Sequence, residues 1–254
     1  MSLFLQAFLG GLLVLLATSL GAVIGTFARR VKKCDCYILL SFAAGVMAFS
    51  VYEMSLESLK KSGAFASFVG SAVGFLIFFL IERLLPHTHL LRNGSEKGRK
   101  KTKTFLLLGA IAIHNIPEGL AVGSAFAGSA VFGWFVSSSI AIQDIPEGLL
   151  ITAPLIIYGL STRKSLFYGI LSGVSETAAA IVGFIFLSRV SALVPFALAF
   201  SSGAMTYVIL VELLPDALSE EGKKGRTVFS FILGIFLTWL LASLLGVSAG
   251  TGVV

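Results

Sequence analysis

The chain has 254 residues, of which 56% are hydrophobic and only 13% are charged, against about 25% charged in an ordinary soluble domain. This composition excludes a water-soluble globular protein and indicates one whose main solvent is a lipid bilayer. The net charge of +6 is accounted for by basic loops beside anionic lipid headgroups, so we expect no nucleic-acid partner.

Apolar stretches long enough to cross a bilayer follow one another along the chain. A span needs about 20 mostly apolar residues, and polar breaks leave eight such stretches. The first has neither the basic start nor the short length of a signal peptide, so we keep it as a mature helix. We predict an all-α membrane protein, one transmembrane domain over residues 1–254, with spans at about 3–27, 37–59, 64–85, 104–127, 132–158, 165–187, 191–215 and 227–249.

Basic residues gather on one side of these predicted spans. Sixteen of the 19 Lys and Arg residues fall in the connections after the first, third, fifth and seventh spans, including the long basic loop 86–103. The positive-inside rule makes these connections cytoplasmic and puts both termini outside the cytoplasm. We therefore predict a multi-pass protein of the plasma or inner membrane.

The fourth and fifth spans carry two copies of one motif. Residues 113–120 read IHNIPEGL and residues 142–149 read IQDIPEGL. Consecutive spans run antiparallel, so the copies face each other about an approximate two-fold axis in the membrane plane. A weaker echo relates F-x-x-G-x-M at 42–47 to the same pattern at 200–205. We predict inverted repeats with a metal site between the fourth and fifth helices.

The two motif copies supply polar side chains at mid-membrane depth. An ionisable group in hydrocarbon costs at least ~2.5 kcal/mol, so each must face a partner or a cavity. In each copy two ligand-type residues lie four apart and share a helix face, with a third beside them. The candidate ligands are His114, Asn115, Glu118, Gln143, Asp144, Glu147 and, at a similar depth on the sixth span, Glu176.

These oxygen and nitrogen ligands suit a borderline or hard divalent cation. Zn²⁺ is the first choice, with Cd²⁺, Fe²⁺, Mn²⁺ and Co²⁺ as alternatives, and the lack of thiolates weighs against Cu(I). Two adjacent ions bridged by Glu118 and Glu147 are conceivable. Pro117 and Pro146 free backbone carbonyls that would add oxygen ligands, or they are plain packing kinks.

Three further features have two interpretations each. Met47, at the same depth on the second span, is either a soft thioether ligand or apolar filling. Glu53 and Glu57, near the outer end of that span, either collect cations at an entrance or form a solvated interfacial face. The pair Glu212 and Asp216 on the seventh span is either an exit or unrelated to transport.

Two histidines, His87 and His89, lie in the basic loop. They would catch released metal there, although two histidines in a loop are a weak signal.

The runs HNIPEG at 114–119 and QDIPEG at 143–148 resemble the signature of the ZIP (Zrt/Irt-like) metal transporters, most closely the GufA-like branch. The resemblance implies a homodimer and metal uptake toward the cytoplasm. It also implies a binuclear site, with one ion held by His114, Glu118, Gln143, Glu147 and Met47, and a second held by Asn115, Asp144, Glu176 and the shared glutamates. Many family members carry His-Glu where this chain has Gln143 and Asp144.

We predict a transporter of divalent metal, most simply zinc, and not an enzyme, with no cofactor beyond the transported ion. The fourth and fifth spans would move against the outer helices to give alternating access. One alternative is an intramembrane metal-dependent hydrolase, which needs an open coordination position and a separate general base. The other is a metal-selective channel, which differs only in lacking a conformational cycle.

Overall fold

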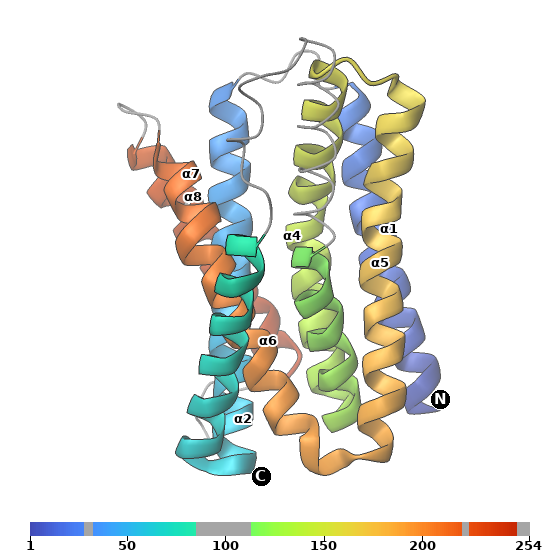
Figure 1. The fold of residues 1–254 in the computed structure, drawn as a ribbon, viewed down its shortest axis with the longest axis vertical. Coiled ribbons are helices and arrows are strands. Elements are labelled where there is room, and N and C mark those ends of the chain that lie inside the picture. The colour runs from blue at the N-terminus through green and yellow to red at the C-terminus, as the bar shows by residue number, and fades with distance from the viewer. Residues whose placement is uncertain (28–32, 85–112, 220–223, 248–254) are drawn as a thin grey trace.

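The computed structural model describes residues 1–27, 33–84, 113–219 and 224–247, and these residues are helical nearly throughout (Figure 1). Six of the described helices are long and apolar enough to cross a membrane. The predicted class, an all-helical multi-pass membrane protein, is therefore confirmed. The elements are α1 (Leu3–Thr26), α2 (Lys33–Leu84), a helix over 113–128, α4 (Ala130–Ile157), α5 (Thr162–Arg189), the 3₁₀ helix η3 (Ser191–Leu193), α6 (Val194–Val208), the π-helix η4 (Ile209–Leu213), α7 (Leu214–Leu218) and α8 (Lys224–Leu244).

Two short breaks reverse the chain at the same end of the molecule. Within α2, Gly63 has φ 79° and ψ 170°, a conformation open to glycine, and it divides the helix into two arms that fold back on each other. Ser129 alone separates the helix 113–128 from α4, and its hydroxyl caps the N-terminus of α4 by accepting from the amide of Phe132. The basic loop 86–103 and the first part of the fourth predicted span lie outside the described residues.

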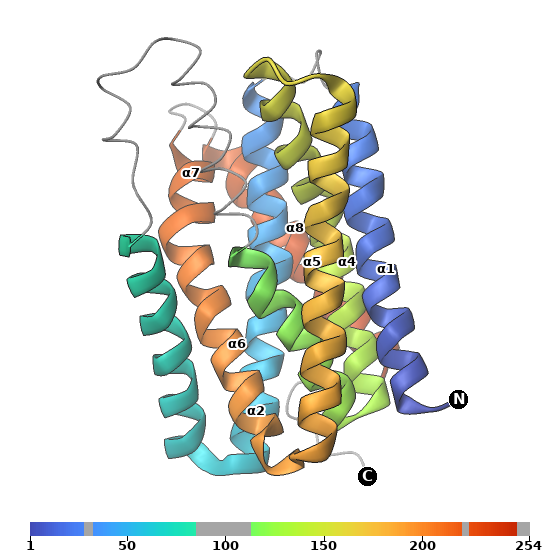
Figure 2. The same ribbon diagram turned by 45° about the vertical axis from the view of Figure 1, so that its right-hand side comes forward.

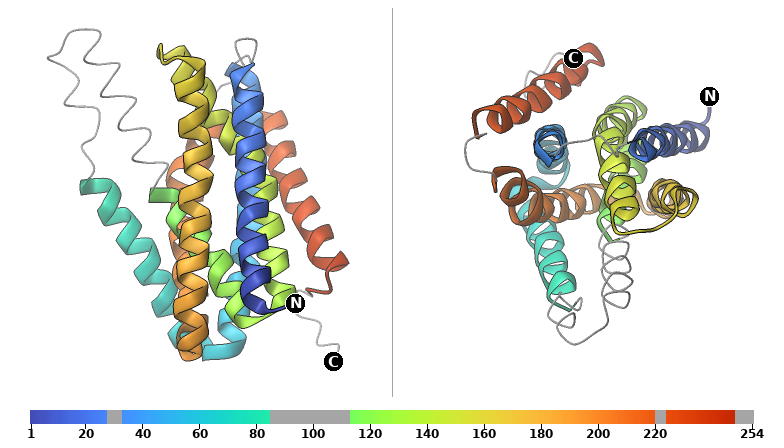
Figure 3. Two further views of the ribbon diagram at one scale, coloured as in Figure 1. Left: turned by 90° about the vertical axis from the view of Figure 1, so that its right-hand side faces the viewer. Right: turned by 90° about the horizontal axis from the view of Figure 1, so that it is seen from above.

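The helices form two bundles that lie side by side (Figures 2 and 3). The first, here called the site bundle, consists of α1, the helix 113–128, α4 and α5; the second, the flanking bundle, consists of α2, α6, η4, α7 and α8. Seen from above, α1, α4 and α5 lie together on one side, and α8 and α2 lie on the other. The bundles meet where α2 passes along α4.

Within each bundle, neighbouring helices approach so closely that a glycine of one helix contacts a backbone carbonyl of the next. In the site bundle, a side chain on Gly119 would collide with the carbonyl oxygen of Glu176, and one on Gly148 with that of Thr18. In the flanking bundle, Gly45 lies in the same way against the carbonyl of Phe231. Small residues at such contacts are the usual basis of close helix packing in membranes, where burial of apolar surface gives no driving force.

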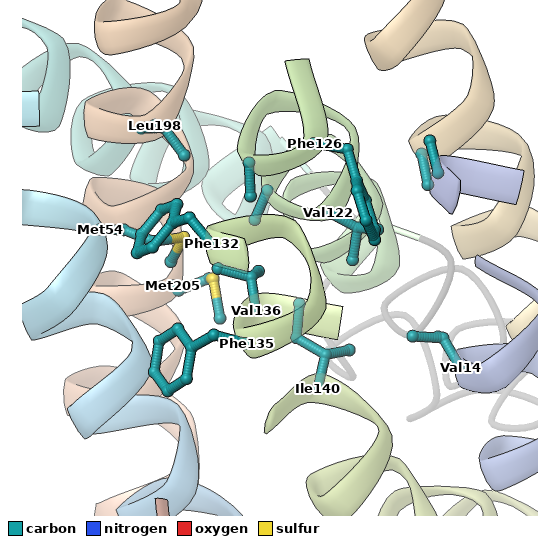
Figure 4. Packing of buried hydrophobic residues seen from close by; sticks show 14 of the residues in the cluster. Val14, Met54, Val122, Phe126, Phe132, Phe135, Val136, Ile140, Leu198 and Met205 are labelled. Carbon is teal, nitrogen blue, oxygen red and sulfur yellow. The ribbon is translucent and has the colours of Figure 1, made fainter. Parts of the chain in front are cut away.

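Large apolar side chains fill the boundary between the bundles. Figure 4 shows Phe132, Phe135 and Val136 of α4 facing Met54 of α2 and Met205 of α6. The ring of Phe135 also packs edge-on against Phe49 of α2, with 6.5 Å between centroids. This boundary is therefore a side-chain contact, unlike the backbone contacts inside each bundle.

The outer surface is apolar, as a bilayer requires. Leu16 on α1, Phe68 on the second arm of α2 and Phe229 on α8 are each at least 60% exposed. Such an exposed apolar surface would be unfavourable in water and is satisfied by lipid chains.

Candidate metal centre

Three carboxylates meet between the two copies of the repeated motif. One oxygen from each of Glu118, Asp144 and Glu147 lies within 4.8 Å of the others. Asp144 and Glu147 sit near the middle of α4, about 21 and 26 Å from its start at a rise of 1.5 Å per residue. Carboxylates this close repel by about 3 kcal/mol per ionised pair at an effective dielectric constant of ~20, so the cluster needs positive charge beside it.

A hydrogen bond joins the two copies directly. The side-chain amide of Gln143 donates to Glu118 Oε1 over 2.6 Å, and both residues are almost fully buried. The glycine that follows each glutamate explains how these side chains reach one another. Gly119 lets the helix 113–128 lie against α5, and Gly148 lets α4 lie against α1, so the motif fixes both ligands and helix spacing.

Asp144 connects the cluster to α1 and α5. Its Oδ2 accepts from the hydroxyl of Thr18 at 3.0 Å, and its carboxyl group lies close enough to that of Glu176 for the two groups to interact. A hydrogen bond between two carboxyl groups requires a proton on one of them. The space between Asp144 and Glu176 therefore takes either a proton or a cation.

The side-chain amides of Asn115 and Gln143 make the same kind of hydrogen bond. Asn115 donates its NH₂ group to the carbonyl and the hydroxyl of Ser172, at 2.9 and 2.8 Å, just as Gln143 donates its own to Glu118. Each amide thus uses its donors on protein groups and keeps its oxygen, the atom that ligates metals.

Buried oxygens without a hydrogen-bond partner concentrate at this site. An unpartnered buried polar atom costs about 1–3 kcal/mol, and few are tolerated in native proteins. Here they come from predicted ligands on three helices, and divalent cations bound between these helices would give them partners. The atoms are Asn115 Oδ1, Glu118 Oε2, Gln143 Oε1, Asp144 Oδ1 and Glu176 Oε1.

Two predicted ligands lie apart from this group. The His114 Nε2 is 2.9 Å from Glu212 Oε1 on η4, although the imidazole remains close enough to Glu147 to interact electrostatically. Met47 is buried in the main apolar cluster, so the described contacts give it the role of filling and do not join it to the carboxylates.

The outer glutamates of α2 differ from each other. Glu57 pairs with Lys61 at 2.8 Å and is partly exposed, as a solvated interfacial face would be. Glu53 is only 3% exposed, and its Oε1 has no partner. Asp216 is exposed on α7, while His87 and His89 lie outside the described residues.

Sequence reasoning missed Thr18 and Ser172, which hold Asp144 and Asn115 from neighbouring helices. Hydroxyl residues are common in membrane helices, where most bond to their own backbone, so Thr18 carries no signal by itself. Ser172 lies one turn before Glu176 on the same face of α5. That spacing is the signal that would have identified it.

These observations define a class first: a multi-pass membrane protein with a candidate cation site buried between antiparallel helices. Residues 85–247 match the family described as ZIP Zinc transporter. The zinc transporter GufA of Myxococcus xanthus is 33% identical over 92% of this chain and 95% of its own. The zinc transporter ZupT of Chlorobaculum parvum is 33% identical over the same shares. The zinc transporter ZIP11 of Xenopus tropicalis is 43% identical over 56% of this chain and 46% of its own length.

The chain therefore belongs to the ZIP family. It is a transporter of divalent metal and not an enzyme, as its sequence predicted.

Proposed function

We propose that this protein carries Zn²⁺ across the membrane toward the cytoplasm through the site between the helix 113–128 and α4. The observation that carries the proposal is the cluster of Glu118, Asp144 and Glu147, within 4.8 Å of one another in the interior of a membrane protein. Its unpartnered oxygens match the hard and borderline cations, and zinc is the metal named for the relatives. Cd²⁺, Fe²⁺, Mn²⁺ and Co²⁺ would fit the same donors.

The donors divide into two neighbouring sets, which supports a binuclear site. Gln143 donates to Glu118, and His114, which is paired with Glu212, is close enough to Glu147 to interact with it electrostatically. These four residues would hold the transported ion, with Met47 as a further ligand if its helix shifts toward them. The neighbouring carboxyl groups of Asp144 and Glu176 also lie close enough to the shared glutamates to interact with them. With Asn115, this pair would hold the second ion.

Matching glycine contacts support an inverted repeat of eight spans. In α2 and α8, Gly45 lies against the carbonyl of Phe231, and Gly234 against that of Phe42. The second arm of α2 and α6 repeat this pattern with the same spacing of three residues in each helix. There the carbonyls are those of Ser71 and Phe200, and the glycines are Gly203 and Gly74.

The site bundle follows the same rule. Gly148 lies against the carbonyl of Thr18, and Gly119 against that of Glu176. The contact of α1 with α4 therefore corresponds to the contact of α5 with the helix 113–128. In the inverted repeat, α1 is then equivalent to α5, and α4 is equivalent to the helix 113–128. A fold related in this way has two similar arrangements available, which is the structural basis of alternating access.

The contrast between boundary and interior supports a carrier over a channel. Glycine contacts lock helices inside each bundle, whereas Phe132, Phe135 and Met205 meet other side chains across the boundary. Methionine and aromatic side chains can repack as two bodies slide. Movement of the site bundle against the flanking bundle would expose the site to each side in turn.

The test is uptake of radioactive zinc into proteoliposomes by the wild type, Glu147→Gln and Glu57→Gln. Both variants remove one carboxylate, but Glu147 belongs to the cluster and Glu57 pairs with Lys61 at the surface. We expect Glu147→Gln to abolish uptake and Glu57→Gln to retain it. Equal uptake by all three proteins would refute the assigned site.

The proposed orientation of the protein, and with it the direction of transport, depends on the positions of the basic loops. We propose a homodimer in the plasma or inner membrane with both termini outside, supported by the asymmetry of basic residues and by the family resemblance. A cysteine introduced within 92–103 should react with impermeant maleimide only from the cytoplasmic side. Labelling of that cysteine in intact cells would reverse the orientation.

A further inference from the structure

One ion pair joins the two bundles beside the candidate metal centre. His114 belongs to the site bundle and Glu212 to the flanking bundle, and their Nε2 and Oε1 atoms are 2.9 Å apart. Glu82, also of the flanking bundle, accepts from the hydroxyl of Tyr207 and lies close enough to His114 to interact with it electrostatically. The imidazole of His114 is therefore paired with Glu212, a carboxylate of the bundle to which His114 does not belong.

The other side-chain hydrogen bonds between helices that are described for residues 1–27, 33–84, 113–219 and 224–247 stay inside one bundle. In the site bundle they include Thr18 with Asp144 and Asn115 with Ser172. In the flanking bundle they include the hydroxyl of Ser41 with the carbonyl of Thr227, the hydroxyl of Ser230 with that of Ile38, and Ser55 with Ser202. The rest of the boundary between the bundles is formed by apolar side chains, whose contacts have no preferred direction. The ion pair of His114 with Glu212 is a directional contact across it.

His114 cannot serve both partners with one nitrogen. In the ion pair its Nε2 carries a proton toward Glu212, whereas a metal ligand must offer a lone pair. The same imidazole lies near Glu147 of the carboxylate cluster. A rotation of the His114 side chain would exchange Glu212 for an ion held beside Glu118 and Glu147.

Glu212 sits on a segment with unusual backbone geometry. It belongs to the π-helix Ile209–Leu213, which precedes Pro215 in the first turn of α7. Proline lacks the amide that would bond to the carbonyl of Val211, so the regular α-helical pattern cannot pass through this point. Single-turn π-helices recur at functional sites because they set a side chain at an angle that a regular helix does not reach.

We propose that Glu212 controls metal loading by holding His114 across the bundle boundary, and that binding of the ion at the carboxylate cluster releases this contact. The empty site is then tied to the flanking bundle, and the occupied site bundle is free to move. This inference rests on the proposed function, since it requires that His114 ligates the transported ion.

Two measurements on purified protein test the proposal. The first is Zn²⁺ affinity of the wild type, Glu212→Gln and the control Asp216→Asn, which removes the same charge one turn further along from an exposed position. We expect Glu212→Gln to bind zinc about fivefold more tightly than the control, the factor given by replacing a competing charge-assisted hydrogen bond with a weaker neutral one. Equal or weaker binding by Glu212→Gln would overturn the proposal, and weaker binding would make Glu212 an orienting partner of His114 during ligation.

The second measurement is the distance between the two bundles, determined from a pair of spin labels. Spin labels replace Phe167 on α5 and Phe229 on α8, both exposed, in a background with Cys34→Ser and Cys36→Ser. Without zinc, Glu212→Gln should show the shifted or broadened distance distribution that zinc produces in the wild type, and Asp216→Asn should not. A distribution in Glu212→Gln identical to that of zinc-free wild type would overturn the proposal. If the wild type binds no zinc, the proposed function fails, and the zinc-free distributions still decide whether Glu212 ties the bundles together.

Discussion

The site bundle and the flanking bundle use the same packing but contain different polar groups. In both, glycines such as Gly148 and Gly45 bring a helix against a neighbour's carbonyl. The site bundle encloses carboxylates and amides whose oxygens lack partners, whereas the inter-helix contacts described in the flanking bundle are mostly neutral hydroxyl bonds. Small-residue packing therefore builds both bundles, and their polar side chains distinguish them.

Glu53 is the exception that makes this comparison testable. Like Glu118 it is a buried glutamate with one unpartnered oxygen, at 3% and 2% exposure, but it lies on α2 in the flanking bundle. If burial of a carboxylate alone marked a transport site, the two residues would be equivalent. If the convergence of ligands matters, only Glu118 is essential.

The largest effect is therefore expected for Glu118→Gln compared with Glu53→Gln. Loss of a charged ligand shared by both ions should lower zinc uptake at least about 100-fold, as ~3 kcal/mol would. Glu53→Gln should leave uptake near that of the wild type, because no second carboxylate of the cluster is near it. Initial rates in proteoliposomes decide the matter, with thermal unfolding in detergent to verify that both variants fold. Equal losses would mean that the flanking bundle also contributes to the ion path.

Next in size are the glycine contacts, compared through Gly119→Ala and Gly45→Ala. Each added methyl group meets a backbone carbonyl, so each variant should lose about 1–3 kcal/mol of stability. Only Gly119→Ala displaces the helix that carries Glu118, so zinc affinity should fall in that variant and persist in Gly45→Ala. Thermal melting and zinc titration of both proteins provide the comparison. Preserved affinity in a destabilised Gly119→Ala protein would separate helix spacing from ligand geometry.

A smaller effect is expected for Gln143→His, which gives each motif copy a histidine. An imidazole nitrogen is a stronger donor to zinc than an amide oxygen, so affinity should rise about tenfold, equivalent to ~1.4 kcal/mol. The second imidazole must lose its proton to bind, so the affinity of the variant should fall more steeply than that of the wild type below about pH 6.5. Zinc titrations from about pH 5.5 to 7.5 test both points, the range being centred on the ordinary pKa of histidine. An unchanged affinity and pH profile would remove Gln143 from the ligand set.

The smallest effect is expected for Met47→Leu. Met47 is buried in the apolar cluster, and leucine conserves most of its volume. Zinc affinity should therefore stay within about twofold of the wild type, since a change below ~0.4 kcal/mol is expected from such a replacement. Cd²⁺ titration is the informative companion measurement, because a thioether is a soft ligand. Selective loss of Cd²⁺ binding would show that Met47 reaches the ion in another conformation.

The fold class and the meeting of the carboxylates could be predicted from the sequence because both depend on periodicity. Long apolar runs indicate membrane helices whatever their neighbours. The repeated motif puts Glu118, Asp144 and Glu147 on consecutive antiparallel helices at mid-membrane depth, and these side chains do lie together.

The partition into two bundles and the partner of His114 could not be predicted in this way. Hydropathy does not reveal that α1 packs on α4 and α5, which are distant in sequence. His114 has carboxylates within reach on both sides, and its pairing with Glu212 depends on how the bundles are positioned. The hydrogen bond of Thr18 to Asp144 could not be predicted either, because hydroxyl groups in membrane helices usually bond to their own helix.

The single residue Ser129 between the helix 113–128 and α4 has a consequence for biogenesis. Each of these helices alone would bring unpaired carboxyl groups into lipid, which opposes its insertion. A connection this short presents the second helix as soon as the first has been synthesised, so Glu118 and Gln143 can satisfy each other before either faces lipid chains. We therefore expect the pair to enter the bilayer as one helical hairpin, and glycosylation mapping of each helix alone and of the pair would reveal the difference.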